Sequence, residues 1–368
     1  MRVGYAFPMP LPTNMHQTID RYIRERTDAQ EFSGVVRMTC GDRELFAGAY
    51  GLASRTWDVP VTIETRFDTA SITKLITAVA TRQLIDAGAF ALDTRVIPYL
   101  GLTGTTLSPD MTVFHCLTHS SGIGDDCEEE DEEDYADLWT STPNYAVTET
   151  ADFVPQFASK PSNFAPGERC RYCNCAFILP GLMIERVSGL TYREYVQRNI
   201  FDRAGMSASG FFHLETCVPE VAEGCDPIRD DEGTIVRWKR NIYSFPPIGS
   251  PDSGAYVTAA DLDHFFRASK DGVLVSKRSA QRLLQPQVFG AKKDGWRLEY
   301  GLGLWFRVDT AGRVVFCEKE GYNAGISGVL RYYPDSDLTL VILSNMAEGA
   351  WTPAEHLHDI LAKFEFTA

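Results

Sequence analysis

The chain has 368 residues, of which 44% are hydrophobic and 23% are charged, a composition typical of a globular protein. Its 21 Phe, 15 Tyr and 6 Trp residues can build a core, which excludes disorder as the main state. The 50 acidic residues outnumber the 35 basic ones and give a formal net charge of −15. Because affinity for nucleic acid depends on clustered Lys and Arg, we expect no nucleic-acid partner.

The cysteines and the N-terminal segment favour a reducing compartment. Nine cysteines, an odd number, are scattered between Cys40 and Cys317 and do not resemble the dense framework of a disulfide-rich protein. Three prolines interrupt residues 1–12, so no signal-peptide core is predicted there. No run approaches the ~20 apolar residues that span a bilayer. We therefore expect a soluble, cytoplasmic protein without a membrane segment.

The first hundred residues predict a helix, two strands and a second helix, in that order. Apolar residues recur at helical spacing within residues 14–26. Strands are predicted at 34–40 and 43–50, on either side of a Gly-Asp turn. From residue 72 the apolar residues return to helical spacing, and this second helix is predicted to end near Gly88.

The rest of the chain predicts helices first and strands afterwards. Three helices separated by long loops are expected at 176–187, 192–201 and 259–268. Four strands and a closing helix are expected at 302–308, 313–319, 326–333, 338–343 and 353–364. Strands near both termini indicate one sheet built from both ends of the chain. We therefore expect one lobe formed by residues 1–70 and 296–368, and a mainly helical lobe formed by residues 71–295, with the substrate cleft between them.

The segment from Asp125 to Asp137 is the one strongly biased stretch, with ten acidic residues and no basic one. Like charges repel, so such a run is expected to lie on a solvated, mobile surface. An alternative is a negatively charged lid that attracts cationic substrates. The Asp-x-Asp-x-Asp-Gly spacing of a calcium loop is missing.

The strongest chemical signal is the pair Ser71 and Lys74 at the start of the second predicted helix. Residues three apart share one face of a helix, so the serine hydroxyl and the lysine ammonium can approach each other. A serine becomes nucleophilic when a neighbouring base takes its proton. The helix N-terminus adds positive potential and N–H groups directed at developing negative charge. The pair alone is weak, because an ordinary helix start with a surface lysine has the same pattern.

Two further motifs follow in order. Tyr172 and Asn174 are two residues apart, so in an extended segment their side chains point the same way. A phenol can relay a proton and an amide can orient a carbonyl. Lys319 and Gly321 end a predicted strand, where the lysine charge can act on the phenol and the glycine lets a substrate lie close to the backbone.

Ser-x-x-Lys, Tyr-x-Asn and Lys-x-Gly in this order resemble the penicillin-recognising serine hydrolases: class C β-lactamases, DD-peptidases and related esterases. The resemblance covers roughly residues 15 to 365. Further matching segments are Phe67-Asp68-Thr69-Ala70, Leu117-Thr118-His119-Ser120-Ser121-Gly122, Phe164-x-Pro166-Gly167, Gly181-Leu182-Met183-Ile184-Glu185, Tyr300-Gly301-Leu302-Gly303 and Gly325. It implies a β-lactamase/transpeptidase-like fold of α/β plus all-α type, with an antiparallel sheet flanked by helices and an inserted helical lobe.

The resemblance also implies a role for each matching position. Ser71 would be the acylated nucleophile, and Lys74 and Tyr172 would share general-base and general-acid duty. Asn174 would hold the substrate carbonyl or amide. The resemblance further implies that Lys319 and Gly321 lie along the substrate, that Lys319 sets the electrostatics of Tyr172, and that the backbone N–H groups of Ser71 and Tyr322 form the oxyanion hole.

Glu320 departs from the family pattern that the resemblance implies, in which the third motif is usually Lys-Thr-Gly or His-x-Gly. A carboxylate facing the cleft would repel a substrate carboxylate. We therefore expect a serine hydrolase that acts through an acyl-enzyme on a small ester, amide or peptide. The alternatives are a β-lactamase or D-amino-acid peptidase, a cytoplasmic acyltransferase that uses the same acyl-enzyme, and a non-catalytic binding or sensor protein.

The remaining cysteine, histidine and glycine motifs are interpreted as structural, and none is assigned a catalytic or metal-binding role. Cys170, Cys173 and Cys175 lack a second ligand pair at zinc spacing and are expected to be buried, unreactive thiols. His119 is expected to be packed and hydrogen-bonded. Gly205-Met206-Ser207 lacks the closing glycine of the Gly-x-Ser-x-Gly turn, which argues against an α/β-hydrolase. No metal or cofactor is predicted.

Overall fold

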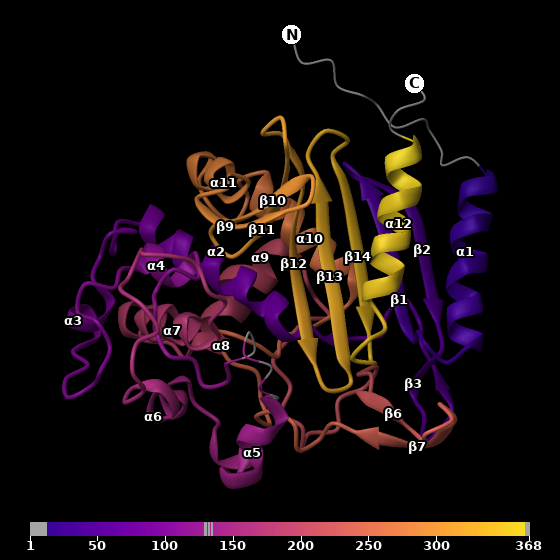
Figure 1. Ribbon diagram of the computed structural model, residues 1–368, viewed down its shortest axis with the longest axis horizontal. Helices are drawn as coiled ribbons and strands as arrows, with labels where there is room; N and C mark the ends of the chain where they lie inside the picture. The colour runs from indigo at the N-terminus through magenta and orange to yellow at the C-terminus, as the bar shows by residue number, and fades with distance from the viewer. Residues whose placement is uncertain (1–12, 129–130, 132, 134, 365–368) are drawn as a thin grey trace.

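A computed structural model describes residues 13–128, 131, 133 and 135–364. The predicted absence of a signal peptide at residues 1–12 and part of the acidic run therefore lie outside the described residues. A large antiparallel sheet stands at one side of the molecule, and a region of short helices and loops stands beside it (Figure 1).

The sheet has eight strands, in the order β2-β1-β14-β13-β12-β11-β10-β9, and every neighbouring pair is antiparallel. The strands are β1 (Gly34–Cys40), β2 (Arg43–Tyr50), β9 (Val288–Lys293), β10 (Trp296–Tyr300), β11 (Trp305–Asp309), β12 (Val314–Asn323), β13 (Ile326–Tyr333) and β14 (Leu338–Ser344). Strands β1 and β14 pair from Gly34 with Ser344 to Cys40 with Leu338, so segments from both ends of the chain are neighbours in one sheet. This confirms the predicted fold class.

Two helices at the termini cover one face of the sheet. They are α1 (Thr13–Asp28) and α12 (Trp351–Phe364). The amphipathic face of α1 buries Met15, Ile19 and Ile23 against the strands, and α12 buries Leu357 and Leu361 beside them. Burying each such side chain contributes about 1.5–3 kcal/mol.

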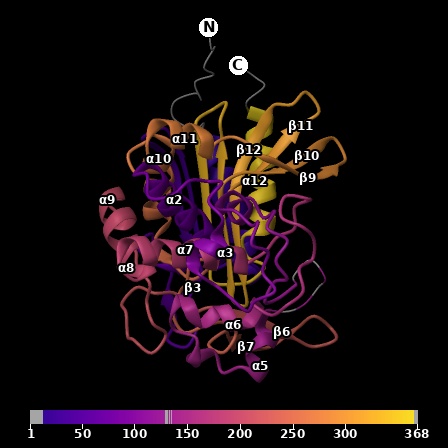
Figure 2. The ribbon, with the colours of Figure 1, turned by 90° about the vertical axis from the view of Figure 1, so that its left-hand side faces the viewer.

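The opposite face of the sheet packs on the helical part of the chain (Figure 2). Its helices are η1 (Ala70–Ile72), α2 (Thr73–Asp86), α3 (Val96–Leu100), α4 (Val113–Leu117), η3 (Tyr135–Asp137), α5 (Leu138–Ser141), η4 (Asn144–Ala146), η5 (Thr150–Phe153), α6 (Val154–Phe157), α7 (Cys175–Ser188), α8 (Tyr192–Val196), the π-helix η6 (Gln197–Phe201), α9 (Asp202–Ala204), α10 (Ala259–Lys270) and α11 (Lys277–Leu283). Three small two-stranded pairs join them: β3 (Leu52–Ser54) with β4 (Val59–Pro60), β5 (Phe67–Asp68) with β8 (Tyr256–Val257), and β6 (Cys225–Arg229) with β7 (Ile235–Arg240).

One apolar core is shared by the sheet and the helical part. Val35 of β1 and Val341 of β14 belong to the same buried cluster as Leu75 of α2, Phe177 of α7 and Phe265 of α10. Side chains alternate between the two faces of a strand, which is why Val35 faces this core while Val36 faces the terminal helices. Helix α2 thus lies between the sheet and α7 and is buried on nearly all sides.

The predicted elements match the structure closely where the periodicity is regular. The two N-terminal strands have the predicted bounds, and the helices at 13–28, 175–188 and 259–270 extend the predicted ones by one or two residues. The helix at 73–86 lies within the predicted one, which was expected to end near Gly88. The helix predicted at 192–201 divides into α8 and a π-helical turn. Strands β9 and β10 were not predicted, because they expose both faces in part and lack a clean alternation.

The division into two lobes at residues 71 and 296 stays a prediction. The sheet itself takes in β9 from Val288 onward, and α10 packs directly on it. Among the described helices, none has both the length and the apolar character that crossing a bilayer requires.

Candidate active site

Ser71 stands in a tight turn that leads into α2. The preceding Ala70 has a φ of +42°, a left-handed conformation that costs an L-residue about 1–2 kcal/mol. The carboxyl group of Asp68 accepts the N–H of Ala70 at 2.7 Å, and the Thr69 hydroxyl donates to the carbonyl of Ala255 at 2.8 Å. These contacts hold the turn, so the direction of the Ser71 side chain is fixed by buried neighbours.

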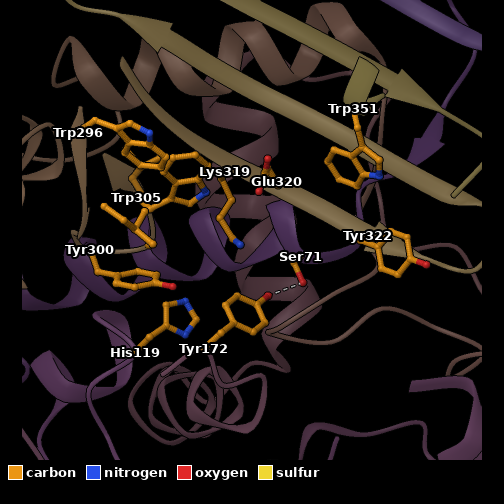
Figure 3. A pocket seen from close by; sticks show the side chains of 13 residues that line it. Ser71, His119, Tyr172, Trp296, Tyr300, Trp305, Lys319, Glu320, Tyr322 and Trp351 are labelled. Carbon is orange, nitrogen blue, oxygen red and sulfur yellow. Dashed lines mark hydrogen bonds between the residues drawn. The ribbon is translucent and has the colours of Figure 1, made fainter. Parts of the chain in front are cut away.

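The hydroxyl of Ser71 receives two hydrogen bonds from the residues that the motifs single out. The Lys74 ammonium donates to Ser71 Oγ at 3.0 Å, and the Tyr172 hydroxyl donates to the same oxygen at 2.7 Å (Figure 3). The structure therefore brings together a serine and a lysine one helical turn apart with a phenol a hundred residues further along the chain. Each of the three groups is within direct proton-transfer distance of another.

Lys74 is completely buried and holds the site together through three acceptors. Besides Ser71, its ammonium donates to the side-chain oxygen of Asn174 at 2.7 Å and to the carbonyl of Asp252 at 2.9 Å. A buried ammonium is tolerated only when its hydrogen bonds are made, and this one has a partner for each N–H group. Asn174 lies at the N-terminus of α7, so Lys74 connects the start of α2 with the start of α7.

His119 packs behind the phenol, as the sequence predicts. Its ring stacks on Tyr172 with centroids 4.5 Å apart, and its Nδ1 accepts the N–H of Cys173 at 3.1 Å. Burial, followed by the charges of Lys319 and Lys74, lowers the pKa of His119 well below its ordinary value. A neutral imidazole therefore supports Tyr172 from one side.

Two ammonium groups lie near the Tyr172 ring. The Nζ atom of Lys319 is 5.0 Å from the ring centroid, and that of Lys74 is 5.2 Å away. In a site that excludes much of the solvent, these charges favour negative charge on the phenol oxygen. The predicted electrostatic influence of Lys319 on Tyr172 thus has the required geometry, and its catalytic role stays a prediction.

Strand β12 runs along the front of Ser71. Its pairing with β11 ends at Glu318, and the next five residues reach past that neighbour into the site. A Cβ atom on Gly321 would lie 2.1 Å from the carbonyl oxygen of Thr69, so glycine is required for β12 to approach the turn before Ser71. Tyr322, the next residue, is 56% exposed.

The acidic run begins in the interior, against expectation. The Asp125 carboxylate accepts the N–H groups of Asn174 at 2.6 Å and Cys175 at 2.9 Å, which caps the N-terminus of α7. Asp125 and Asp126 are 2% and 3% exposed, and burial together with Asp125 raises the pKa of Asp126 well above its ordinary value. The expected solvated surface is wrong for these two residues, which support the site instead.

The predicted burial of the cysteines near the second motif holds for Cys173 and Cys175 and is wrong for Cys170. Cys173 and Cys175 are buried, and desolvation raises the pKa of both thiols well above the ordinary value, whereas Cys170 is half-buried. Within the described residues, Asp125, Asp126 and Cys175 bring possible metal-ligand atoms within 4.8 Å of one another. The Asp125 carboxylate is already engaged by backbone N–H groups there, and the cluster is explained by helix capping.

Two cavities open on Ser71. The first, of about 440 Å³, is lined by Ser71, Tyr172, Lys319 and Glu320 together with a wall of aromatic side chains (Figure 3). The second, of about 630 Å³, is more polar and includes Asn174 and Asp252. Ser71 thus borders both cavities, so each cavity can hold a different part of a substrate. Glu320 lines the first cavity only.

The chain belongs to the Beta-lactamase family, whose model matches residues 19–363. It is a serine hydrolase of this family. A penicillin-binding protein from Bacillus halodurans is similar in structure, with a TM-score of 0.84 and 35% identity over 92% of this chain and 99% of that one.

Two curated relatives represent different activities within the family. Penicillin-binding protein 4 of Amycolatopsis lactamdurans is 25% identical over 83% of this chain and 78% of its own length. Esterase EstB of Burkholderia gladioli is 30% identical over 68% of each chain. The family therefore fixes the kind of chemistry, and the particular substrate must be argued from the site.

Proposed function

We propose that the protein hydrolyses a small ester, amide or peptide through an acyl-enzyme on Ser71. One observation carries the proposal: Ser71 Oγ is hydrogen-bonded both to Lys74 at 3.0 Å and to Tyr172 at 2.7 Å. Such convergence of an amine and a phenol on a hydroxyl is what an activated serine needs, because either group can take its proton once it is itself deprotonated.

The reaction then proceeds in two halves. Ser71 Oγ attacks the substrate carbonyl carbon while its proton passes to the Tyr172 oxygen or the Lys74 nitrogen, and that proton goes on to the leaving alcohol or amine. Asn174, fixed by Lys74, lies where it can hold the substrate. Water attacks the resulting ester and gives a proton to the same base. That proton passes to Ser71 Oγ as the bond between Ser71 and the acyl carbon breaks, so the acid product leaves with Ser71 and the base restored.

Esters and small amides are favoured over β-lactams by the position of Glu320. The carboxyl group lines the cavity that contains Ser71, and it would repel the carboxylate that β-lactam antibiotics carry. The similarity to Esterase EstB supports the same preference. Hydrolysis by a β-lactamase or D-amino-acid peptidase activity, and acyl transfer to an alcohol or amine by a cytoplasmic enzyme, remain the competing proposals.

A substrate panel tests the proposal. Acyl esters, D- and L-amino-acid amides and β-lactams are assayed with the wild type, with Ser71→Ala, and with Ser207→Ala as a matched control at an exposed serine. We expect Ser71→Ala to lower turnover of the preferred substrate by at least about 10³-fold, with Ser207→Ala unchanged.

Intact-mass spectrometry after a fluorophosphonate probe gives an independent readout. We expect one adduct on the wild type and on Ser207→Ala, and none on Ser71→Ala. A folded wild type that forms no adduct and hydrolyses nothing would favour a non-catalytic binding protein, and full turnover by Ser71→Ala would refute the acyl-enzyme.

A further inference from the structure

The cavity that contains Ser71 has an aromatic wall that the catalytic chemistry does not use. The rings come from β10, β11, β12 and the first residue of α12, namely Trp296, Tyr300, Trp305, Tyr322 and Trp351. Tyr322 and Trp351 contact each other, with ring centroids 6.2 Å apart. The faces of indole and phenol rings carry partial negative charge, so a cavity lined by them attracts cations as well as apolar groups.

Glu320 adds a carboxyl group to this wall. Because side chains alternate along β12, Glu320 lies on the opposite face from Lys319, and in Figure 3 it stands between Trp305 and Trp351. Burial raises the pKa of Glu320, and the nearby charge of Lys319 and the neighbouring Trp305 side chain act in the opposite direction.

Two cationic side chains act on Glu320, Lys319 and Arg331, and each also has other partners. The guanidinium of Arg331 is buried and pairs with Glu318 at 2.5 Å and with Glu355 at 2.8 Å. The ammonium of Lys319 lies 5.0 Å from the Tyr172 ring, on the catalytic side of the strand. A largely desolvated carboxylate among aromatic faces is most stable with a cation against it.

We propose that this aromatic–carboxylate pocket, formed by Glu320, Trp305, Trp351 and Tyr322, binds a protonated or quaternary amine of the substrate. The inference rests on the proposed function, because it names the substrate class of the same site: esters or amides that carry a positive charge. The net charge of −15 acts in the same sense, since it draws cations toward the molecule.

Matched substrates test the pocket. Acetylthiocholine is compared with neutral 3,3-dimethylbutyl thioacetate, and 4-(trimethylammonio)butanoyl thioesters with neutral 5,5-dimethylhexanoyl thioesters, so the charge stands on either side of the scissile bond. We expect kcat/KM to favour the cation by about tenfold or more in at least one pair. Glu320→Gln should lower that ratio about tenfold, and Glu25→Gln, which removes the same charge from the exposed face of α1, should leave it within about twofold.

A binding measurement separates the pocket from the chemistry. Choline and its neutral analogue 3,3-dimethyl-1-butanol are titrated calorimetrically into Ser71→Ala, with and without Glu320→Gln, and circular dichroism monitors folding. We expect choline to bind about tenfold more tightly, and the difference to be lost with Glu320→Gln; Trp351→Leu is the second variant, expected to weaken choline binding.

The outcomes distinguish the two proposals. Equal binding of choline and its neutral analogue, or an unchanged ratio in Glu320→Gln, would overturn the cation pocket even where Ser71→Ala abolishes hydrolysis. Choline binding that depends on Glu320, in a protein whose turnover survives Ser71→Ala, would instead support the pocket and refute the acyl-enzyme.

Discussion

Among single residues, Lys74 fixes the orientation of the Asn174 side-chain amide. An ammonium only donates hydrogen bonds, so its contact at 2.7 Å must be with the oxygen of the Asn174 amide. The two N–H bonds of that amide are then turned to the other side, where Asn174 lines the second cavity. We therefore expect the proposed substrate contact of Asn174 to be with an oxygen rather than with an N–H group.

Asp68 gives a prediction about pH. Burial raises the pKa of Asp68 from its ordinary value of 3.8 to about 7 in the folded protein. Since the folded chain holds this proton more tightly than the unfolded chain, Asp68 makes folding less favourable as pH rises from about 4 to 7. Asp68→Asn keeps an acceptor for the Ala70 N–H and removes the charge.

We therefore expect Asp68→Asn to match the wild type in unfolding free energy near pH 4 and to exceed it by up to about 4 kcal/mol at pH 8. Urea unfolding at a series of pH values measures the difference. Asp58→Asn, at an exposed aspartate, serves as the control and should show no such trend. A stability difference that does not change with pH would contradict the assigned role of the buried carboxyl group.

At the level of secondary-structure elements, the site depends on where helices begin. Ser71 stands at the start of α2 and Asn174 at the start of α7, and Asp125 neutralises the N-terminus of the second helix from a loop fifty residues earlier. Side chains at helix starts are well ordered because the first backbone N–H groups bind fixed acceptors. The geometry around Lys74 therefore depends on the hydrogen bonds that fix the turn before α2 and the start of α7.

Asp125→Ala should weaken both stability and catalysis. The substitution leaves the N–H groups of Asn174 and Cys175 buried without their acceptor, which costs about 1–3 kcal/mol. Asn174 should shift, and kcat should fall about tenfold or more. Asp131→Ala is the matched control from the same acidic run, because Asp131 is 63% exposed and its pairing with Arg171 contributes at most about 1 kcal/mol. Equal losses in the two variants would rule out the capping role.

Some of these elements and site residues can be predicted from the sequence, and others cannot, for physical reasons. Helical spacing alone places Ser71 and Lys74 on one face of α2, and alternation alone gives β1 and β2. Tyr172 and Lys319 join the site only through tertiary packing, which the resemblance to a known family supplied. Asp125 was missed because a run of like charge is normally solvated, and only the folded chain brings an uncapped helix start to it.

The aromatic wall shows the same limit. Trp296, Trp305 and Trp351 come from three separate elements, and β10 itself was not predicted. No local sequence pattern predicts that aromatic side chains from different strands and a helix will line the same cavity. Glu320, in contrast, was recognised from its motif, and it is one of the residues that line the first cavity.

For the molecule as a whole, the shared core predicts cooperative unfolding. Val35, Leu75 and Phe177 belong to one apolar cluster that joins the sheet to the helical part. Neither part retains its buried surface without the other, so we expect one transition. Urea unfolding followed by far-UV circular dichroism, which reports mainly on the helices, and by tryptophan fluorescence, to which Trp296 and Trp305 of the sheet contribute, should give coincident curves. Two separated midpoints would show instead that the parts are independent domains.

The pairing of β1 with β14 has a consequence for biosynthesis. The hydroxyl of Ser344 donates to the carbonyl of Ser33 across 311 positions of sequence, so β14, which joins β1 to the rest of the sheet, is synthesised long after β1. Until then the nascent chain presents the unmatched edge of β1 and the apolar residues beside it. Productive synthesis of this enzyme should depend on factors that shield that edge until β14 has been made.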